Sequence, residues 1–434
     1  MKKILTIIFG MLLLITSESK AVKANVDYPT DELKIYPQHP GESEDFGGIL
    51  GMHYLWVTAD STPRRSNRIL LDIKQLDQAK WVVLPHVRWE TVPENDISRV
   101  CTFIKTAKSE KKKLIVKIGS ACLEPSKDNW SKNTPPDELA WIADIIPQIV
   151  DCQGFDTSTD YIMLGNEPNL DNCDMETYAD NMTKLLKAYQ KPGDEKINFA
   201  TVGLSPHVST YREQNKTLYD RLKSEGVLPQ IKAWGYHGYE NGDLINNRSW
   251  ITLSQDLSAK GFKGTILADE IGFFNNSDTT GNKQYDNFKT TLTMMKNFNS
   301  STDVPIEAAV AWLQADDGGH LNDLNVAINY GLYCDTAIPA SSCGSINLGN
   351  NPTTQPLAER KAMTLFYSQN ADRSSKKASS TEDTPTPQTN SPPTETPTQN
   401  NSTPTIIAFI SVFIIIILVV ILTYAVIWGS LLGK

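Results

Sequence analysis

The sequence predicts an α/β fold, a (β/α)8 barrel, from two observations. Between residues 48 and 368, short apolar runs alternate with segments of helical periodicity, and the runs number eight. The runs are nearly continuous and β-branched, which specifies a parallel sheet covered on its outer face. Barrels of this kind take about 250 residues and grow with inserted loops. An open doubly wound sheet is the alternative, but no Gly-rich phosphate-binding motif follows an early run.

Eight strands are expected, one for each apolar run. They cover residues 49–53, 81–85, 114–118, 161–165, 197–202, 233–236, 265–269 and 307–312. Helices are expected where apolar residues recur at three- and four-residue steps, because this spacing buries one face of the helix. Six such stretches stand out, at residues 66–80, 97–108, 136–150, 175–190, 250–261 and 358–369.

Residues 1–24 have the pattern of an export signal peptide. Lys2 and Lys3 precede a short apolar run, and the small residues Ala21 and Ala24 stand where a signal peptidase cleaves. An uncleaved anchor helix is the alternative, although the apolar run is shorter than the about 20 residues that a membrane span needs. We therefore expect the protein to be exported.

Three segments are expected to follow the signal. Residues 25–372 contain enough apolar side chains to form one large globular domain. Residues 373–405 are rich in Ser, Thr and Pro and too polar to bury a core, so they form an extended stalk. Residues 406–432 carry no charge and can cross a membrane as a helix, with the domain outside at the cell surface. A lipid-anchor signal is the alternative at this end.

The charge and the cysteine content exclude several classes of protein. The 41 basic and 50 acidic residues sum to a net charge of −9, which provides no basic field, so no nucleic-acid partner is expected. The six cysteines form no CxxC pair and no HExxH segment is present, so neither a metal nor another cofactor is expected. A barrel enzyme with metal or lyase chemistry therefore lacks its ligand cluster.

Export permits disulfides and N-linked glycans. A local bridge between Cys334 and Cys343 is expected, together with a bridge between Cys122 and Cys173 that would brace the rim of the barrel. The two cysteines without an expected partner are Cys101 and Cys152. The asparagines that begin candidate glycan sites are Asn129, Asn181, Asn215, Asn247, Asn275 and Asn299.

Two glutamates follow strands at the face where barrel enzymes carry their chemistry, the C-terminal ends of the strands. Glu167 follows the fourth strand and Glu270 the seventh, so their side chains are expected on one rim, facing each other. Hydrolysis of a glycosidic bond needs such a pair, about 5–5.5 Å apart in retaining enzymes. A desolvating neighbour would keep Glu167 protonated, and hydrogen-bond donors would keep Glu270 ionised.

The Asn-Glu-Pro segment at residues 166–168 and the Glu-Ile-Gly segment at residues 270–272 resemble motifs of the clan A glycoside hydrolases. This superfamily consists of retaining glycosidases on a (β/α)8 barrel, and the resemblance covers most of the expected barrel. It implies that Glu167 is the proton donor and acid/base, that Glu270 is the nucleophile, and that Asn166 holds the sugar 2-hydroxyl.

Other strand ends carry further parts of the resemblance. His237 and Tyr239, after the sixth strand, are similar to an HxY element that would orient the nucleophile. Arg88, past the second strand, resembles an arginine that supports the nucleophile in many members. Trp312 stands where members carry an aromatic floor beneath the sugar, and Trp89 is a second candidate for stacking on a sugar ring. The third strand offers no histidine, so no individual family is assigned.

Together these residues imply a glycosidase that hydrolyses O-glycosyl bonds of an extracellular polysaccharide or oligosaccharide, and we expect it to act as a monomer. Residues 203–207 and the Phe273-Phe274 pair are reminiscent of enzymes that cut glucan backbones internally, which favours a β-glucan or a related β-linked glycan. A carbohydrate-binding adhesin without catalysis is the alternative, because the same scaffold can hold a glycan without cutting it.

Overall fold

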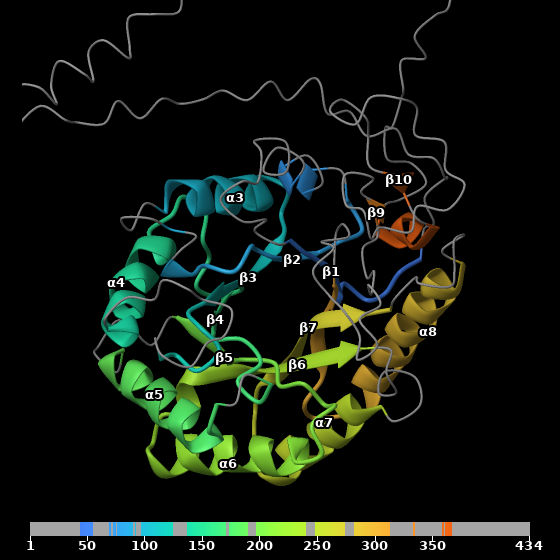
Figure 1. The fold of residues 1–434 in the computed structure, drawn as a ribbon. Helices are drawn as coiled ribbons and strands as arrows, with labels where there is room; N and C mark the ends of the chain where they lie inside the picture. Colours follow the sequence, from blue (N-terminus) through green and yellow to red (C-terminus); the bar gives the residue numbers. More distant parts are fainter. Residues whose placement is uncertain are drawn as a thin grey trace, which may run out of the picture. The chain divides into compact units, whose positions relative to one another are not determined.

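The computed structural model of the chain confirms the barrel. Eight parallel strands pair in sequence order, and the first also pairs with the last, so the sheet closes on itself (Figure 1). Each strand begins within two residues of its expected start. The strands are β1 (Leu50–His53), β2 (Trp81–Val83), β3 (Lys113–Ile118), β4 (Tyr161–Leu164), β5 (Asn198–Thr201), β6 (Ile231–Tyr239), β7 (Thr265–Gly272) and β8 (Ile306–Ala311).

The residues that the structure describes belong to the first of two compact units, Met1–Ser375. They are residues 44–54, 69–70, 73–74, 76–89, 92, 97–124, 137–170, 173–189, 197–239, 248–273, 282–312, 333–334, 358–359 and 361–366. The expected signal peptide, the stalk and the helix at residues 406–432 lie outside them. Within the described ranges, no helix is both long enough and apolar enough to cross a membrane.

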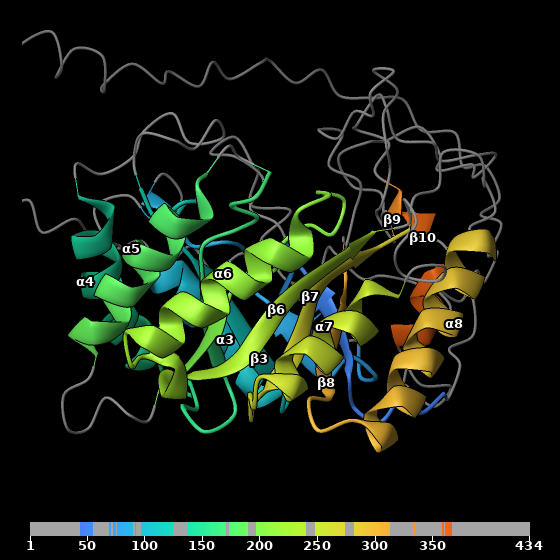
Figure 2. The same ribbon diagram turned by 90° about the horizontal axis from the view of Figure 1, so that it is seen from below.

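Helices surround the barrel (Figures 1 and 2). They are α3 (Ser98–Ser109), α4 (Glu138–Val150), α5 (Met175–Ala188), α6 (Tyr211–Ser224), α7 (Ser249–Ala259) and α8 (Asn282–Phe298). The first three and α7 match expected stretches. Helices α6 and α8 are not among those stretches; α6 is strongly charged and buries only four side chains, so its buried stripe is narrow.

Two expected helices are wrong in part. Within residues 358–369, strand β10 (Ala358–Glu359) pairs antiparallel with β9 (Tyr333–Cys334), and a 3-10 helix follows at Lys361–Phe366. Pairing with β9 holds the start of this segment in an extended conformation. An amphipathic pattern in the sequence cannot reveal such a partner. In the stretch 66–80, the described residues up to 74 are helical, but residues 76–80 form a turn and a connection into β2.

Side chains inside the barrel form an apolar plug. Strand residues alternate between the helix-facing side and the inner side, and the inner residues make a separate buried cluster. Its members are Trp81, Val83, Ile115, Tyr161, Met163, Ala200, Ala233, Leu267, Ala308 and Val310. The small alanines leave room for Trp81 and Tyr161, whose ring centroids lie 6.0 Å apart. The next inward residues of each strand therefore lie above the plug, at the C-terminal ends of the strands.

The packing of the folded domain excludes two of the candidate glycan sites. Asn181 is 3% exposed, and its amide nitrogen donates to Glu124 Oε1 over 3.1 Å. Asn215 is buried, and its side-chain oxygen accepts from Trp234 Nε1 over 2.8 Å. These amides hold loops and helices together, so neither nitrogen is accessible for a glycan in the folded domain.

Candidate active site

Three charged side chains lie directly above the apolar plug. Lys117 of β3 and Asp269 of β7 each follow an inner residue of the plug by two positions, and His237 of β6 follows one by four. The two-residue period of a strand turns all three side chains inward. Lys117 is 1% exposed, and His237 and Asp269 are fully buried. The barrel thus encloses a cluster of charges where its core ends.

A β-bulge lets two neighbouring acidic residues face this cluster. Glu270 follows Asp269 directly, and in a regular strand their side chains would point to opposite sides. The pairing between β6 and β7 shifts here: Gly235 pairs with Leu267, but His237 pairs with Glu270. The same shift occurs between β7 and β8. The extra residue in β7 re-aims one side chain, as bulges beside active sites do, and Glu270 turns inward with 2% exposure.

Glu167 lies in the turn after β4. Its φ is 41°, a left-handed conformation that is uncommon for a residue with a side chain, and Gly165 before it has a φ of 88°. Asn169 ties this turn to the loop after β5, because its Oδ1 accepts from Ser205 N over 3.0 Å and its Nδ2 donates to Ser205 O over 2.8 Å. The turn therefore holds Glu167 in a strained conformation, with 17% of its side chain exposed.

His237 joins the two glutamates. Its Nδ1 lies 2.8 Å from Glu167 Oε1 and 3.3 Å from Glu270 Oε2. One oxygen of each carboxyl group and a ring nitrogen of His237 all fall within 4.8 Å of one another. The carboxyl groups of Glu167 and Glu270 thus lie close together, with one oxygen of each within 4.8 Å of the other.

Both ring nitrogens of His237 face carboxyl groups. Nε2 lies 3.1 Å from Asp269 Oδ2, and Nδ1 faces Glu167 and Glu270. A ring that carries both protons can donate Nε2–H to Asp269, whereas Nδ1 makes no hydrogen bond among the described residues. Burial alone would lower the pKa of His237, but the negative charges of Glu270, Asp269 and Glu167 raise it to about 10. His237 is therefore an imidazolium at neutral pH.

Lys117 is the cation in direct contact with Glu270. Its Nζ donates to Glu270 Oε1 over 2.7 Å and lies 2.9 Å from Asp269 Oδ2. Burial opposes ionisation of both carboxyl groups, yet Lys117 and His237 hold the pKa of each below its usual value. Burial also opposes the charge on Lys117, whose pKa is nevertheless raised by Asp269 and Glu270. Two buried cations thus balance two buried anions.

Three aromatic side chains complete the surroundings of Glu270. Tyr239 of β6 donates its hydroxyl to Oε2. His53, at the end of β1, places Nδ1 3.8 Å from Oε1, and burial holds the pKa of His53 well below its usual value, so its ring is neutral. Trp312, directly after β8, packs edge-on against His53 with ring centroids 4.5 Å apart. The site therefore receives side chains from β1, β3, β6, β7 and β8.

The support of Glu270 that the resemblance assigns to Arg88 stays a prediction. Arg88 Nε donates to His86 Nδ1 over 3.2 Å, and among the described residues the cations that contact Glu270 are Lys117 and His237. Lys117 stands on the inner side of β3, while Arg88 follows the end of β2 by five residues.

The other expected residues have varied surroundings. Asn166 is half-buried in the turn that carries Glu167. Trp89 packs edge-on against Trp141 of α4, with ring centroids 6.0 Å apart. Phe273 is fully buried against Phe288 of α8, so it belongs to the core and gives no support to a glucan-binding pair.

Sequence reasoning misses three members of the site: Lys117, Asp269 and His53. A signal for Lys117 is present, because it is the only charged residue in the expected strand 114–118. A charge inside a buried strand breaks the local pattern, and such violations concentrate at functional sites. Asp269 and His53 end expected strands, but the bulge and the partners that turn them toward Glu270 are tertiary features.

The three residues Glu167, His237 and Glu270 could each offer one ligand atom to a metal ion. Ligation needs a free lone pair on the imidazole, yet both ring nitrogens of His237 face carboxyl groups and its raised pKa favours the protonated ring. A cation would also meet the charge of Lys117. We therefore do not assign these residues as metal ligands.

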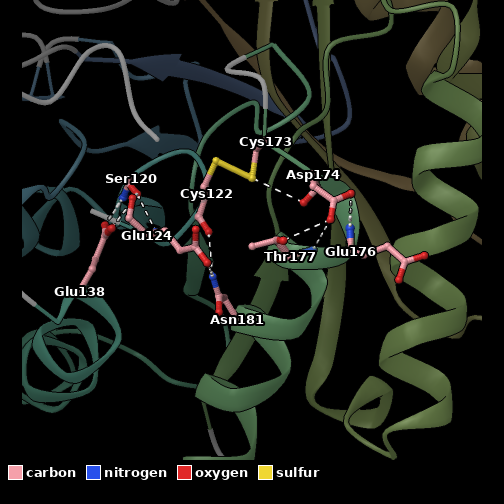
Figure 3. The surroundings of a disulfide bond; sticks show 9 residues. All are labelled: Ser120, Cys122, Glu124, Glu138, Cys173, Asp174, Glu176, Thr177 and Asn181. Carbon is pink, nitrogen blue, oxygen red and sulfur yellow. Dashed lines mark hydrogen bonds between the residues drawn. A yellow bond between two sulfur atoms is a disulfide. The ribbon is translucent and has the colours of Figure 1, made fainter. Parts of the chain in front are cut away.

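The bridge between Cys122 and Cys173, here called the rim disulfide, is confirmed. It joins the turn after β3, the strand of Lys117, to the segment before α5 (Figure 3). Asp174 begins α5 by accepting from Glu176 N and Thr177 N. The rim disulfide thus connects the two turns that follow β3 and β4.

Cys101 and Cys152, which have no partner in the sequence interpretation, form a second bridge, here called the helix disulfide. It joins α3 to the turn after α4. Cys343, the expected partner of Cys334, lies outside the described residues. Disulfides persist in oxidising compartments, so these two bridges indicate a secreted or extracellular domain.

Comparison with known proteins finds similarity by structure alone. No protein-family model matches the sequence, and no curated protein does either. Matching solved structures include a family 39 glycoside hydrolase from Bacteroides cellulosilyticus WH2, with 13% identity and a TM-score of 0.44 over 66% of this chain and 59% of that enzyme. The chain therefore spans less than two thirds of the length of that enzyme.

Two further matches have similar scores. The family 1 β-glucosidase from Exiguobacterium antarcticum B7 is 12% identical, with a TM-score of 0.47 over 70% of this chain and 85% of that one. XacCel5A, solved in complex with cellopentaose, is 12% identical, with a TM-score of 0.46 over 74% of this chain and 100% of that one. These proteins belong to the class that the two glutamate motifs resemble. At such identities the likeness concerns the fold, and no individual family is assigned.

Proposed function

We propose that this chain is a retaining glycoside hydrolase that cleaves O-glycosidic bonds of an extracellular polysaccharide, a β-glucan or a related β-linked glycan. The observation that carries the proposal is the pair Glu167 and Glu270, whose carboxyl oxygens lie within 4.8 Å of each other at the C-terminal ends of the strands. A pair this close favours double displacement, because a water molecule has no room between the two groups as inversion requires.

In the first step, Glu270 attacks the anomeric carbon and Glu167 protonates the leaving oxygen. The bond from the carbon to the leaving oxygen breaks, and a glycosyl ester forms on Glu270. Glu167, as the acid, carries the proton that the leaving oxygen takes, and His237 Nδ1 lies 2.8 Å from its Oε1. The low pKa of Glu270 supports this assignment, because the nucleophile must be ionised before it attacks.

In the second step, Glu167 acts as a base. It removes a proton from water, the water oxygen bonds to the anomeric carbon, and the ester bond to Glu270 breaks. The proton stays on Glu167, which restores its starting state. Two inversions at one carbon give retention of configuration.

Other residues of the site would bind the sugar. Asn166, in the turn of Glu167, is proposed to hold the 2-hydroxyl. Trp312, beside His53, would form the floor under the ring, and Trp89 and Arg88 would contact the sugar or the sugar next to it. Tyr239 would orient Glu270, whose Oε2 already accepts its hydroxyl. No cofactor takes part in this reaction.

The protein is proposed to act at the cell surface as a monomer. The two disulfides are consistent with an extracellular domain. Residues 1–24 would direct export, residues 373–405 would form a stalk, and residues 406–432 would anchor the chain in the membrane. Binding of a long glycan outside the cell then needs no second subunit.

The test is hydrolysis of β-glucans, β-mannans, xylans and galactans by the full-length chain and its variants. Glu167→Gln is expected to lower the rate by about 10²–10⁴-fold, the usual contribution of a general acid, and Glu270→Gln should abolish hydrolysis. Glu307→Gln is the matched control: Glu307 lies near the start of β8 and accepts from Tyr161 and Thr265. Its loss should reduce stability and leave the rate of hydrolysis unchanged.

Two results would refute parts of the proposal. Near-normal hydrolysis by Glu270→Gln would overturn the roles of the two glutamates. Binding of a glycan without hydrolysis on every substrate would favour the adhesin. Proton NMR of the first product decides the stereochemistry, and initial inversion would contradict double displacement.

A further inference from the structure

Lys117 and Asp269 take no part in the reaction proposed above, yet they occupy the most protected positions of the site. Lys117 is 1% exposed and Asp269 is fully buried. Burying a charge costs free energy that its partners must offset. If Glu270 only filled space, apolar side chains would suffice at the positions of Lys117 and Asp269. The buried ion pair of Lys117 and Asp269 therefore indicates a role in the chemistry of Glu270.

We propose that Lys117 is a positioning residue for Glu270, and that Asp269 keeps Lys117 in place throughout the reaction. The inference rests on the proposed function, since it takes Glu270 as the nucleophile. It adds a residue on the third strand that the resemblance does not supply.

The two oxygens of Glu270 have different partners. Oε1 accepts from Lys117 Nζ over 2.7 Å. Oε2 accepts from the Tyr239 hydroxyl and lies 3.3 Å from His237 Nδ1, the atom that also contacts Glu167. Lys117 thus fixes the oxygen that does not face the acid, and it leaves Oε2 on the side where the glycosidic oxygen must receive its proton. An attack through Oε2 places both carboxyl groups on the bond to be cleaved.

Asp269 is needed because the charge of Glu270 disappears during the reaction. When Oε2 bonds to the anomeric carbon and the bond to the leaving oxygen breaks, the carboxylate becomes a neutral ester. Lys117 then still has Asp269 Oδ2 at 2.9 Å, so its ammonium stays paired. Asp269 also faces Nε2 of His237 at 3.1 Å. One carboxylate therefore holds both buried cations before and after ester formation.

The titration of Glu270 reports on this arrangement, because every charged neighbour contributes to it. Removal of the Lys117 cation should raise the pKa of Glu270. Removal of the like charge of Asp269 should lower it further. The titratable groups that face Glu270 from the surrounding strands and turn are Lys117, His53, His237, Tyr239, Asp269 and Glu167.

The experiment is a carbon-13 NMR titration of the full-length chain labelled at the glutamate side-chain carboxyl carbon. The signal absent from Glu270→Gln identifies the residue. We expect the wild-type midpoint to lie below the ordinary value of about 4.3. In Lys117→Met the midpoint should rise, and in Asp269→Asn it should fall. A pair with a purely structural role would move neither midpoint, or would move both in the same direction through general loosening.

Kinetics give the second measurement. In Lys117→Met, kcat should fall by about 10²-fold, the cost of misplacing a reacting group by about 1 Å. KM should stay near the wild-type value, because Lys117 is buried behind Glu270. The acidic limb of kcat/KM should follow the NMR midpoint in both variants. If Lys117→Met fails to fold, the same measurements are made on Asp269→Asn and on the double variant Lys117→Met with Asp269→Asn, which removes one charge of each sign.

A matched control comes from a second ion pair of the barrel. Lys108 Nζ lies 2.8 Å from Asp160, which is fully buried. The double variant Lys108→Met with Asp160→Asn should lower thermal stability and leave the Glu270 midpoint and kcat unchanged. Unmoved midpoints in the Lys117 and Asp269 variants would overturn the inference alone. Opposite shifts in a chain that hydrolyses no glycan would support the contact and refute the proposed function.

Discussion

The imidazolium of His237 makes the stability of the barrel depend on pH, and its surroundings set the size of the effect. In the folded chain its pKa is about 10, because three carboxyl groups outweigh the effect of burial. In the unfolded chain it returns to about 6.5. The difference of about 3.5, at about 1.4 kcal/mol per pH unit, amounts to about 5 kcal/mol of stabilisation below pH 6.5.

The sign follows from the protons bound in each state. Between about pH 6.5 and pH 10 the folded chain holds one proton more than the unfolded chain on His237, so the free energy of unfolding falls as pH rises. Lys112 acts in the opposite direction: burial lowers its pKa to about 8, and its Nζ donates to Leu76 O and Ala79 O. Above about pH 8 the two contributions nearly cancel. The loss of about 1.4 kcal/mol per pH unit should therefore appear between about pH 7 and pH 8.

The assay is urea unfolding of the full-length chain, followed by tryptophan fluorescence at several pH values across this window. The variant His237→Gln should show no such slope. In Lys112→Met the slope should continue to about pH 10, because the opposing group is gone. A flat wild-type profile between pH 7 and pH 8, or the same slope in His237→Gln, would refute the charge that we assign to His237.

Two further variants test how the site is held. The change Gly203→Ala would place a new Cβ 2.1 Å from the Cδ2 atom of His237, so the ring must move, and we expect a loss in kcat of about 10²-fold with the barrel still folded by circular dichroism. Replacing the rim disulfide by Cys122→Ser with Cys173→Ser should lower the free energy of unfolding by about 2–4 kcal/mol, since it releases a loop spanning 51 residues. Removal of the helix disulfide, whose cysteines are also 51 residues apart, should lower the stability by a similar amount but leave kcat unchanged. If removal of either disulfide changes kcat equally, the rim disulfide has no specific role at the site.

Much of the framework follows from local patterns. The eight strands are visible because each is a short apolar run, and a buried parallel strand needs apolar side chains on both faces. Glu167 and Glu270 can be found because polar residues directly after such runs lie at the rim. Hydrophobic periodicity does not reveal helix α6, because its charged surface contains few apolar residues.

The positions of the buried charges in the site cannot be predicted from the sequence pattern alone. Alternation would send Asp269 and Glu270 to opposite faces, and only the shift in pairing of β7 with its neighbours turns both inward. The contact of Lys117 with Glu270 joins residues 153 positions apart in the sequence, so no local signal connects them. Strand order is local, whereas the reach of a side chain across the barrel is not.

The sequence alone thus determined the order of the strands and the position of Glu167 and Glu270 at their C-terminal ends, because these depend on hydrophobic periodicity and chain direction. The tertiary structure decided which charged groups surround Glu270 and His237, and that a disulfide braces the rim. These features depend on distances between distant strands inside a low-dielectric interior, where a charge is stable only if its partners are in place.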